Sequence, residues 1–376
     1  MFIPVQETIQ PAKIKIVGVG GAGGNAINRM ISYGFTGVDF ISINTDQQIL
    51  SRSEASVKIQ IGKNISRGLG GGGNPDVGKK SAEESRDEIR EAIEGADMLF
   101  ITAGMGGATG TGASPIVAEI AKELGILTIA IVTKPFNFEG NKRINSASGG
   151  ILSLKEAVDT MLVIPNEKLK NISDRTTPLN KLFEAADTVL YQAAKGISDI
   201  IIRPGFVNRD FADVKAVMTC RGDAVIGVGS AKGEDKGASA AQIALDCPIL
   251  EDSSIEGASA MLVTLTGPSN MAYGDIEDAM EIIRKRAGGN TDINWGAAFD
   301  DAFEDELRIT IVATGISRDK QAVQTQQKAD VLELFGSQNK KEDKKNEEIL
   351  AAVSVKRITV PENDLDKPAY QRRASD

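Results

Sequence analysis

The sequence from Gly104 to Gly112, Gly-Met-Gly-Gly-Ala-Thr-Gly-Thr-Gly, follows a predicted buried strand, Met98 to Thr102, and precedes a predicted helix, Ala113 to Leu124. Glycines give the backbone access to conformations closed to other residues, and the free amides and dipole of a helix start attract anions. Thr109 and Thr111 add hydroxyl donors. The stretch therefore predicts a polyphosphate-binding loop. A tight turn beside a helix cap is the alternative, but it explains only one or two of the glycines.

Two other glycine-rich stretches, Gly20 to Gly24 and Gly70 to Asn74, also follow predicted strands. The first belongs to a GxGxxG pattern, which alone is a weak fingerprint of dinucleotide binding, with Asp39 or Asp46 as the acidic ribose ligand. One pyrophosphate needs one such turn, whereas three converging loops suit a triphosphate. The P-loop pattern GxxxxGK followed by Ser or Thr is missing, so the protein is not a P-loop enzyme.

Predicted strands and helices alternate through the first half of the chain, which indicates a parallel sheet covered by helices on both faces. Ligands of such sheets bind beyond the carboxyl ends of the strands. Apolar residues at a period of 3.6 then predict one long helix from Pro178 to Arg203, about 40 Å in length. Shorter alternating elements follow. The predicted fold is α/β, with an N-terminal Rossmann-like parallel-sheet domain, a long central helix, a smaller C-terminal α/β domain and a disordered tail.

The predicted elements have the following bounds. Strands are predicted at Lys13 to Gly20, Phe40 to Asn44, Val57 to Ile61, Met98 to Thr102, Leu127 to Thr133, Met161 to Ile164, Val225 to Gly229, Met261 to Thr266 and Leu307 to Ala313. The other helices are predicted at Asn25 to Tyr33, Ser81 to Ile93, Asp210 to Met218, Ser239 to Leu245 and Ile276 to Lys285.

The composition limits the classes of function. The net charge of −9 and pI near 5.0 argue against nucleic acid as a partner. We expect a cytoplasmic protein without direct membrane insertion, because the chain starts without a signal peptide and its apolar runs are too short to span a bilayer. Cys220 and Cys247 are predicted to be reduced core thiols. The absence of histidine excludes Ser-His-Asp and Cys-His catalysis.

Three motifs in this order make the chain recognisable: Gly104 to Gly112, Lys134 to Gly140 (Lys-Pro-Phe-Asn-Phe-Glu-Gly) and Asn208 to Val214 (Asn-Arg-Asp-Phe-Ala-Asp-Val). Together they resemble the FtsZ family of bacterial cell-division GTPases, relatives of tubulin, from about Lys13 to Ile316. The resemblance implies binding of GTP and GDP, with Mg²⁺ held mainly by phosphates and water and no metal ligands from the protein.

Two loops depart from the family pattern. Ala108 replaces a glycine of the family's GGGTGTG signature, which would cost about 1 kcal/mol if that position required a positive φ. Gly71, Gly72 and Gly73 replace the usual Ala-Gly-Ala of the loop near the γ-phosphate. We expect the first change to be tolerated and the second to loosen its loop.

The base is expected at Phe183 and Asp187, which lie one turn apart on the long helix. A ring can stack on a purine, and a carboxylate can accept hydrogen bonds from guanine N1–H and the 2-amino group. Core packing of Phe183 and a solvated Asp187 are the alternatives. The resemblance adds Asn25 and Asn166 around the base and Glu139 and Arg143 beside the ribose and phosphates, where a surface i,i+4 ion pair is the alternative. The predicted nucleotide site comprises Gly20, Gly21, Gly24, Asn25, Gly72, Gly73, Gly104, Gly106, Gly107, Ala108, Thr109, Gly110, Thr111, Gly112, Thr133, Glu139, Arg143, Asn166, Phe183 and Asp187.

No base for hydrolysis lies near the glycine loops, so Asp210 and Asp213 are the candidates, with Asn208 beside them. Helix capping is their structural alternative. A straight central helix would separate them from the base by about 25 Å or more. A nucleotide does not span this gap within one subunit. We therefore expect these residues to complete the site of the next copy in a head-to-tail filament, in agreement with what the resemblance implies.

The resemblance also implies how the chain is divided into domains and which partners it binds. Residues 363–373 are similar to the family's peptide for division proteins and membrane tethers, although Lys367 and Gln371 stand where apolar residues are usual. The expected place of action is the division site. An NAD-dependent oxidoreductase and a non-polymerising nucleotide-binding regulator are the alternative functions. The predicted parts are a flexible N-terminus (1–12), a GTP-binding domain (13–177), the central helix (178–203), a C-terminal domain with the catalytic loop (204–317), a disordered linker (318–362) and a partner-binding peptide (363–376).

Overall fold

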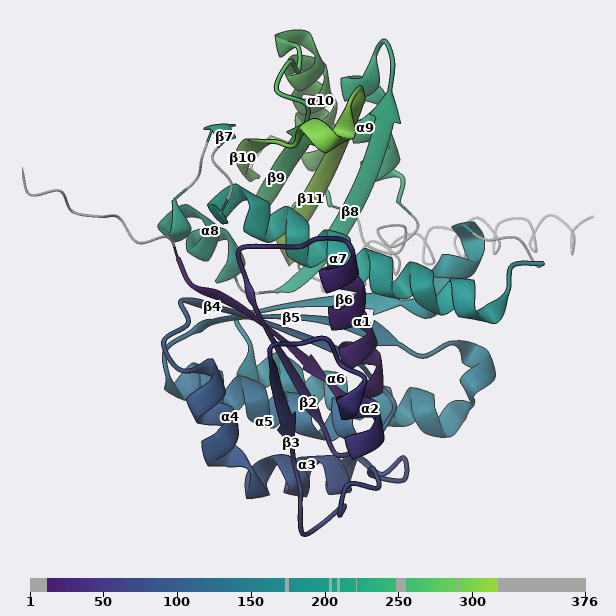
Figure 1. Ribbon diagram of the computed structural model, residues 1–376. Coiled ribbons are helices and arrows are strands. Elements are labelled where there is room, and N and C mark those ends of the chain that lie inside the picture. The colour runs from purple at the N-terminus through teal and green to yellow at the C-terminus, as the bar shows by residue number, and fades with distance from the viewer. Residues whose placement is uncertain are drawn as a thin grey trace, which may run out of the picture. The chain divides into compact units, whose positions relative to one another are not determined.

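The structure is a computed structural model of the chain, which divides into two units, residues 1–317 and 318–376 (Figure 1). The expectations for residues 1–11, for the linker and for the tail peptide lie outside the described residues. The structure describes residues 12–172, 176–202, 205–207, 210–220, 222–247, 255–289 and 291–316, all within the first unit.

Six parallel strands form the first part of the sheet, in the order β3-β2-β1-β4-β5-β6. Helices cover both of its faces, so the central strands β1, β4 and β5 are almost completely buried, whereas the edge strand β3 is mostly exposed. All but the last of the seven residues of β4 are buried. The strands are β1 (Ile14–Val19), β2 (Asp39–Asn44), β3 (Val57–Gln60), β4 (Met98–Gly104), β5 (Leu127–Lys134) and β6 (Thr160–Pro165).

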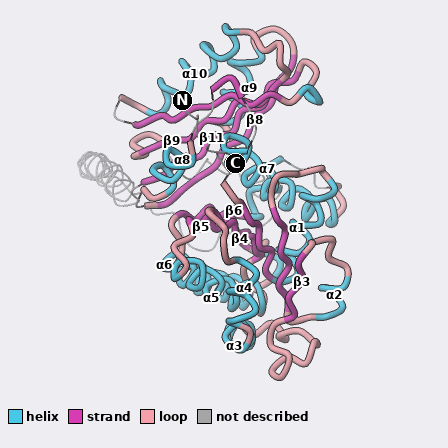
Figure 2. The backbone as a smooth tube through the Cα atoms, turned by 60° about the vertical axis from the view of Figure 1, so that its left-hand side comes forward, coloured by secondary structure: helices cyan, strands magenta, loops and turns pink. Residues whose placement is uncertain are grey.

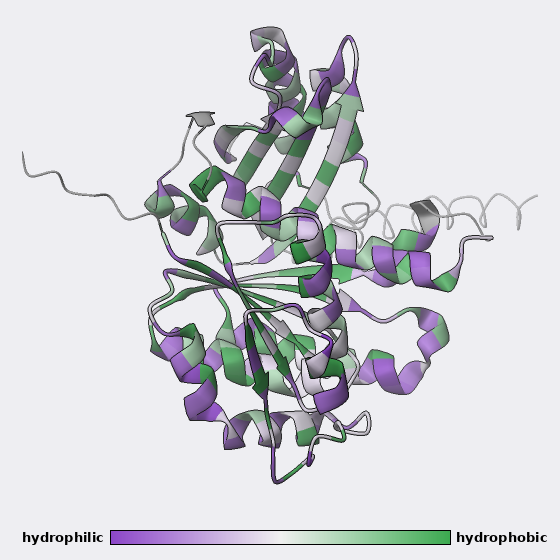
Figure 3. Ribbon diagram, viewed as in Figure 1, coloured by the Kyte–Doolittle hydropathy of each residue, from purple (hydrophilic) through white to green (hydrophobic). Residues whose placement is uncertain are grey.

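Most helices of this half bury one apolar stripe and turn their polar side to solvent (Figure 3), whereas α5 is buried over almost its whole length. α1 and α7 share one core with the sheet, and α3 to α6 share the core on the other face. The elements are α1 (Gly20–Ser32), α2 (Gln47–Ser51), α3 (Pro75–Glu84), α4 (Arg86–Ile93), α5 (Thr109–Glu123), α6 (Asn141–Ala157), α7 (Leu179–Ile202) and the 3-10 helices η1 (Asn137–Glu139) and η2 (Asn166–Ile172).

The sheet continues into a second, mixed part in the order β8-β11-β9-β10-β7, which joins β6 through the single residue pair Leu162–Ala224. Here β9 and β10 are parallel and the other neighbours antiparallel. The elements are β7 (Gly205–Val207), α8 (Phe211–Met218), β8 (Asp223–Lys232), α9 (Lys236–Leu245), β9 (Ala260–Gly267), α10 (Tyr273–Ala287), β10 (Asp292–Phe299), η3 (Asp301–Phe303) and β11 (Glu306–Ile316).

The long helix α7 lies between the two parts of the sheet (Figure 2). Its buried residues Leu190, Ala194 and Ile197 belong to one core with Leu262 of β9 and Val312 of β11 as well as with the first sheet. On the opposite face of the second part, α9 and α10 enclose a separate core. The predicted α/β fold with a long central helix is therefore confirmed.

Several predicted boundaries were wrong. α1 begins at Gly20 and α5 at Thr109, so both glycine stretches already contain the first helical turns. The predicted helix from Ser81 to Ile93 is two helices, which are separated at Ser85. The polar helix α6 and the strand β10 were not predicted. Both cysteines are free thiols that are half-buried against the cores rather than fully inside them.

Candidate functional site

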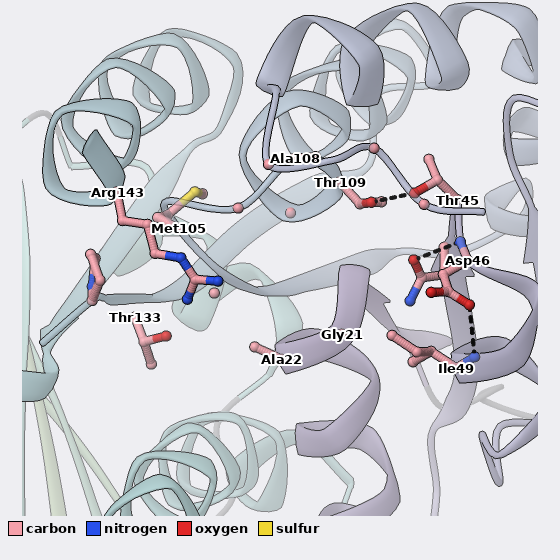
Figure 4. A pocket seen from close by; sticks show the side chains of 18 of the residues that line it. Gly21, Ala22, Thr45, Asp46, Ile49, Met105, Ala108, Thr109, Thr133 and Arg143 are labelled. Carbon is pink, nitrogen blue, oxygen red and sulfur yellow. Dashed lines mark hydrogen bonds between the residues drawn. The ribbon is translucent and has the colours of Figure 1, made fainter. Parts of the chain in front are cut away.

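The glycine-rich stretches meet at the carboxyl ends of the parallel strands, around a cavity of about 440 Å³ (Figure 4). This volume lies in the range of small-molecule sites. Figure 4 shows Arg143 and Thr133 on one side of the cavity and Thr45 and Asp46 on the other. Of the predicted nucleotide residues, those that line it are Gly21, Gly72, Gly73, Gly104, Gly107, Ala108, Thr109, Gly110, Thr133, Glu139, Arg143, Asn166, Phe183 and Asp187.

The other predicted nucleotide residues lie beside or beneath this cavity. Gly24 and Asn25 line an adjoining cavity of about 260 Å³. A Cβ on Gly20 would lie 2.8 Å from the amide nitrogen of Gly110, so this glycine permits close contact between α1 and α5. The hydroxyl of Thr111 accepts a 2.8 Å hydrogen bond from the amide of Gly106. A Cβ on Gly112 would lie 2.0 Å from the carbonyl oxygen of Pro75. These residues shape the loop from within.

Sequence reasoning missed part of the lining. Asn44 ends β2 and Thr45 follows it, beside Asp46, which was considered only as a ribose ligand of a dinucleotide; this placement after a strand, like that of the glycine stretches after β1 and β4, was the available signal. The hydroxyls of Thr45 and Thr109 are 2.6 Å apart in a buried hydrogen bond. The further lining residues are Ala22, Ile49, Leu69, Gly70, Gly71, Met105, Pro135 and Ala186.

The two candidate ribose ligands of the dinucleotide alternative are Asp39 and Asp46. Asp39 begins β2 and therefore lies at the amino edge of the sheet, away from the glycine stretches. Asp46 caps α2, where its Oδ1 accepts hydrogen bonds from the amides of Gln48 (2.9 Å) and Ile49 (3.2 Å). Neither position favours a dinucleotide on the first glycine stretch.

Ala108 precedes α5 with φ −77° and ψ −64°, in the ordinary right-handed region. The strain considered for a positive φ therefore does not arise at this position. Because α5 begins at Thr109, its first amides point toward the cavity end of the helix, where they and the helix dipole favour an anion.

The other end of the cavity carries Phe183, Asp187 and Asn166. Phe183 is 40% exposed, and its ring packs edge-on against Phe136 at 5.4 Å between centroids. Burial raises the pKa of Asp187 to about 7, with a smaller raising effect from Glu184 and an opposing effect from Arg29. The side chain of Asn166 is buried, and its Oδ1 has no hydrogen-bond partner among the described residues. An orphaned acceptor and an under-solvated carboxyl in one cavity are consistent with a ligand that donates hydrogen bonds.

Glu139 and Arg143 form an i,i+4 ion pair of 2.5 Å at the start of α6. The second carboxylate oxygen of Glu139 accepts a 2.9 Å hydrogen bond from the amide of Phe136. The ion pair lines the cavity, with the guanidinium group more exposed than the carboxylate. It thus places one positive and one negative charge on the cavity wall.

Asp210 and Asp213 lie at the start of α8. Oδ1 of Asp210 accepts a 2.8 Å hydrogen bond from the amide of Asp213, so the predicted capping role is present. Asp210 is exposed and Asp213 half-buried, and neither lines the cavity described above. Asn208 lies outside the described residues.

α8 lies at the amino edge of the parallel sheet (Figure 1). The hydroxyl of Thr160, the first residue of β6, donates to the carbonyl oxygen of Met218, the last residue of α8. At the other end of β6, about 17 Å away, Asn166 lines the cavity. α7 spans a similar gap, because the fifteen residues from Asp187 to its end cover about 22 Å. The two sets of predicted site residues therefore face opposite edges of one sheet.

Among the residues that the structure describes, no group of three or more Cys, Asp or Glu side chains is placed to hold a metal ion. Within the same residues, no helix has the length and apolarity needed to cross a membrane.

Comparisons with known proteins agree with this geometry. The model of the Tubulin/FtsZ family, GTPase domain, matches residues 13–174, and that of the FtsZ family, C-terminal domain, matches residues 222–317. A mutant of FtsZ from M. jannaschii is 45% identical, with a TM-score of 0.78 over 81% of this chain and 92% of its own. An empty FtsZ dimer from the same organism is 44% identical, with a TM-score of 0.77 over 81% of this chain and 89% of its own.

A more distant structure shares the fold. GDP-bound CetZ1 from Haloferax volcanii is 20% identical, with a TM-score of 0.71 over 81% of this chain and 94% of its own. One conclusion follows from the family models, from the identity to FtsZ and from the cavity at the carboxyl ends of the strands. This chain belongs to the tubulin/FtsZ family and is a GTP-binding GTPase of the FtsZ type.

Proposed function

We propose that the protein polymerises head to tail and that each GTP site is completed by the α8 start of the next copy. The observation that carries this proposal is the separation of the two half-sites: the cavity lies at the carboxyl edge of the parallel sheet, and Asp210 and Asp213 lie toward its amino edge. A contact between opposite edges of identical subunits is heterologous, and such a contact generates a filament when it does not close.

The proposed orientation of GTP places the phosphates on the amides at the start of α5 and the base near Phe183. The carboxylate of Asp187 accepts from guanine N1–H and the 2-amino group, whereas adenine has no matching donor pair. The orphaned oxygen of Asn166 supports a donor at this end of the cavity. The ion pair of Glu139 and Arg143 lies beside the ribose and the phosphates.

We propose that Mg²⁺ in this site is held mainly by phosphates and water, because this ion commonly keeps several of its waters. When bound, it neutralises charge on the phosphates in the transition state. The remaining chemistry belongs to the chain. Asp210 and Asp213 of the next copy orient and polarise the attacking water, and Asn208 positions the terminal phosphate.

The rim of the cavity supports a contact with a second protein surface. Leu69 lines the cavity and is 80% exposed, and Phe138, which stacks on Phe136, is 56% exposed. Large apolar side chains beside a charged ligand site are costly to leave in water, and burial against another subunit removes this cost. The comparison structure of an FtsZ dimer agrees with such self-association.

The cellular role that we propose is a cytoplasmic division ring at the division site. In this role residues 13–177 bind GTP, residues 204–317 carry the catalytic loop, and residues 363–373 bind division proteins or membrane tethers across the linker. Lys367 and Gln371 favour a partner that accepts a more polar peptide than the family's usual one.

The test is GTP turnover per subunit as a function of protein concentration, with sedimentation measured in parallel. We expect turnover to be negligible below a threshold concentration and to rise steeply above it, at the concentration where the protein begins to sediment. An equal turnover per subunit below and above that concentration would refute assembly-coupled hydrolysis. NAD in place of GTP serves as the control for the oxidoreductase alternative and should produce neither signal.

A further inference from the structure

Gly71 and Ala108 lie against each other, although they belong to different glycine-rich stretches. A Cβ built on Gly71 would lie 2.4 Å from the Cβ of Ala108, whereas ordinary contacts of a Cβ are 3.4 Å or longer. Gly71 is not among the glycines with a positive φ, so an alanine there would meet only this steric conflict. The methyl group of Ala108 therefore occupies the space that a side chain at position 71 would need.

The backbones of Gly71 and Ala108 are both held by neighbouring contacts, so neither can easily move to relieve the conflict. The amide of Gly70 donates to the carbonyl oxygen of Thr45 at 3.2 Å, and Thr45 is itself hydrogen-bonded to Thr109 at the start of α5. On the other side, the carbonyl oxygen of Gly71 accepts from the amide of Asn74 at 3.1 Å. Gly71 is thus fixed from both directions.

Ala108 is also held in place by α3. A Cβ on Gly78 would lie 2.3 Å from the carbonyl oxygen of Ala108, so α3 packs directly on this peptide. Asn74 caps α3 through a 3.0 Å hydrogen bond from the amide of Asp76. The turn at residues 70–74, the start of α3 and the start of α5 therefore form one packed unit around Ala108.

We propose that Ala108 and Gly71 are a matched pair of positioning residues that sets the distance between the 70–74 turn and the amides of α5. Both residues line the cavity. The consequence for GTP rests on the proposed function, in which the phosphates lie on the amides at the start of α5, and it adds that the terminal phosphate lies against the 70–74 turn, which lines the same cavity.

The experiment is a cycle of G71A, A108G and the double variant, with melting temperatures measured without nucleotide and Kd values measured for GTP and GDP with Mg²⁺. In the wild-type background we expect G71A to lower the melting temperature and to reduce the ratio of GTP to GDP affinity about tenfold. In the A108G background the same change should have at most a twofold effect. G149A is the matched control, because it adds a methyl group in open space on α6, and it should leave the ratio unchanged.

The readouts separate the possible failures. Additive melting temperatures across the cycle would show that the two positions do not interact and would overturn the pair. Coupled melting temperatures with equal losses of GTP and GDP affinity would show a packing contact only and would overturn the positioning role. A wild-type protein that binds no GTP would refute the proposed nucleotide orientation, while the nucleotide-free cycle would still test the steric contact.

Discussion

The two edges of the parallel sheet differ in how much of a ligand site one chain forms at each of them. At the carboxyl edge, loops after β1, β2, β4, β5 and β6 already enclose a cavity with an orphaned acceptor and a carboxyl of raised pKa. At the amino edge, the exposed carboxylate of Asp210 caps α8, and the half-buried Asp213 lies in the first turn of this helix. Under the proposed function this difference makes binding and hydrolysis separable properties of this fold, so each edge can be damaged without the other.

The largest expected effect comes from the amino edge. Asp213→Ala should lower kcat for GTP about 10²- to 10³-fold, because the carboxylate that polarises water is removed. The Kd for GTP should stay within about threefold, because Asp213 does not line the cavity. Single-turnover hydrolysis and equilibrium binding measure the two quantities. If GTP binding were lost together with turnover, Asp213 would contribute to binding as well, and the two edges would not have separate roles.

The next effect lies at the carboxyl edge. Asp187→Asn should weaken GTP binding about 100-fold at pH 8, because a charged acceptor of two hydrogen bonds is replaced by a neutral amide with one acceptor oxygen. ATP binding should stay weak in both proteins, so selectivity for guanine falls. Competition binding with both nucleotides measures this change. An unchanged Kd for GTP would remove Asp187 from the base site.

The raised pKa of Asp187 predicts that stability and GTP binding at the carboxyl edge both depend on pH. Its ordinary value of 3.8 rises to about 7 in the fold, so the folded protein holds this proton more tightly than the unfolded chain does. The contribution of Asp187 to the free energy of unfolding is therefore greatest below about pH 4 and falls as pH rises through 7. Without nucleotide, Asp187→Asn should raise the melting temperature more at pH 8 than at pH 5. GTP affinity should instead decrease as the pH falls below 7, because protonation removes the acceptor. If the difference in melting temperature between Asp187→Asn and the wild type were the same at both pH values, the raised pKa of Asp187 would be contradicted.

The smallest expected effect concerns the missed residue of the cavity. Thr45→Val removes the buried hydrogen bond to Thr109 and should lower the free energy of unfolding by about 1 to 2 kcal/mol. For a protein of this size, the melting temperature should fall by about 1.5 to 3 °C. Thr109→Val and the double variant complete the cycle, since both single changes break the same bond. Fully additive losses would show that the two hydroxyls do not stabilise each other.

Much of the fold was predictable because local patterns and tertiary environment agree in it. The apolar run of β4 and the 3.6-residue period of α7 are each strong signals, and the structure has both elements. The starts of α1 and α5 were missed because glycine is a poor helix former, and only close packing between the two helices makes it necessary there. α6 was missed because its polar sequence has only a narrow buried stripe.

The site was predictable where residues follow strands in a glycine-rich pattern or match a known motif. Phe183 and Asp187 line one cavity with the phosphate loops, although about seventy residues separate them in the sequence. Asn44 and Thr45 carry no such pattern, and their contribution depends on the register between β2 and β1. The contact between Gly71 and Ala108 has no sequence signal at all, because it depends on tertiary packing of α3 against α5.

The most direct measurement mixes two variants of low activity, at a GTP concentration far below the Kd of Asp187→Asn. Asp213→Ala keeps the cavity and lacks the catalytic carboxylate, whereas Asp187→Asn keeps α8 and lacks the base contact. If each site is shared between two copies, an equal mixture should hydrolyse GTP at up to about a quarter of the wild-type rate per subunit, since one pairing in four is productive. A rate no greater than the sum of the two variants measured alone would show that the site is complete within one chain and would contradict the account.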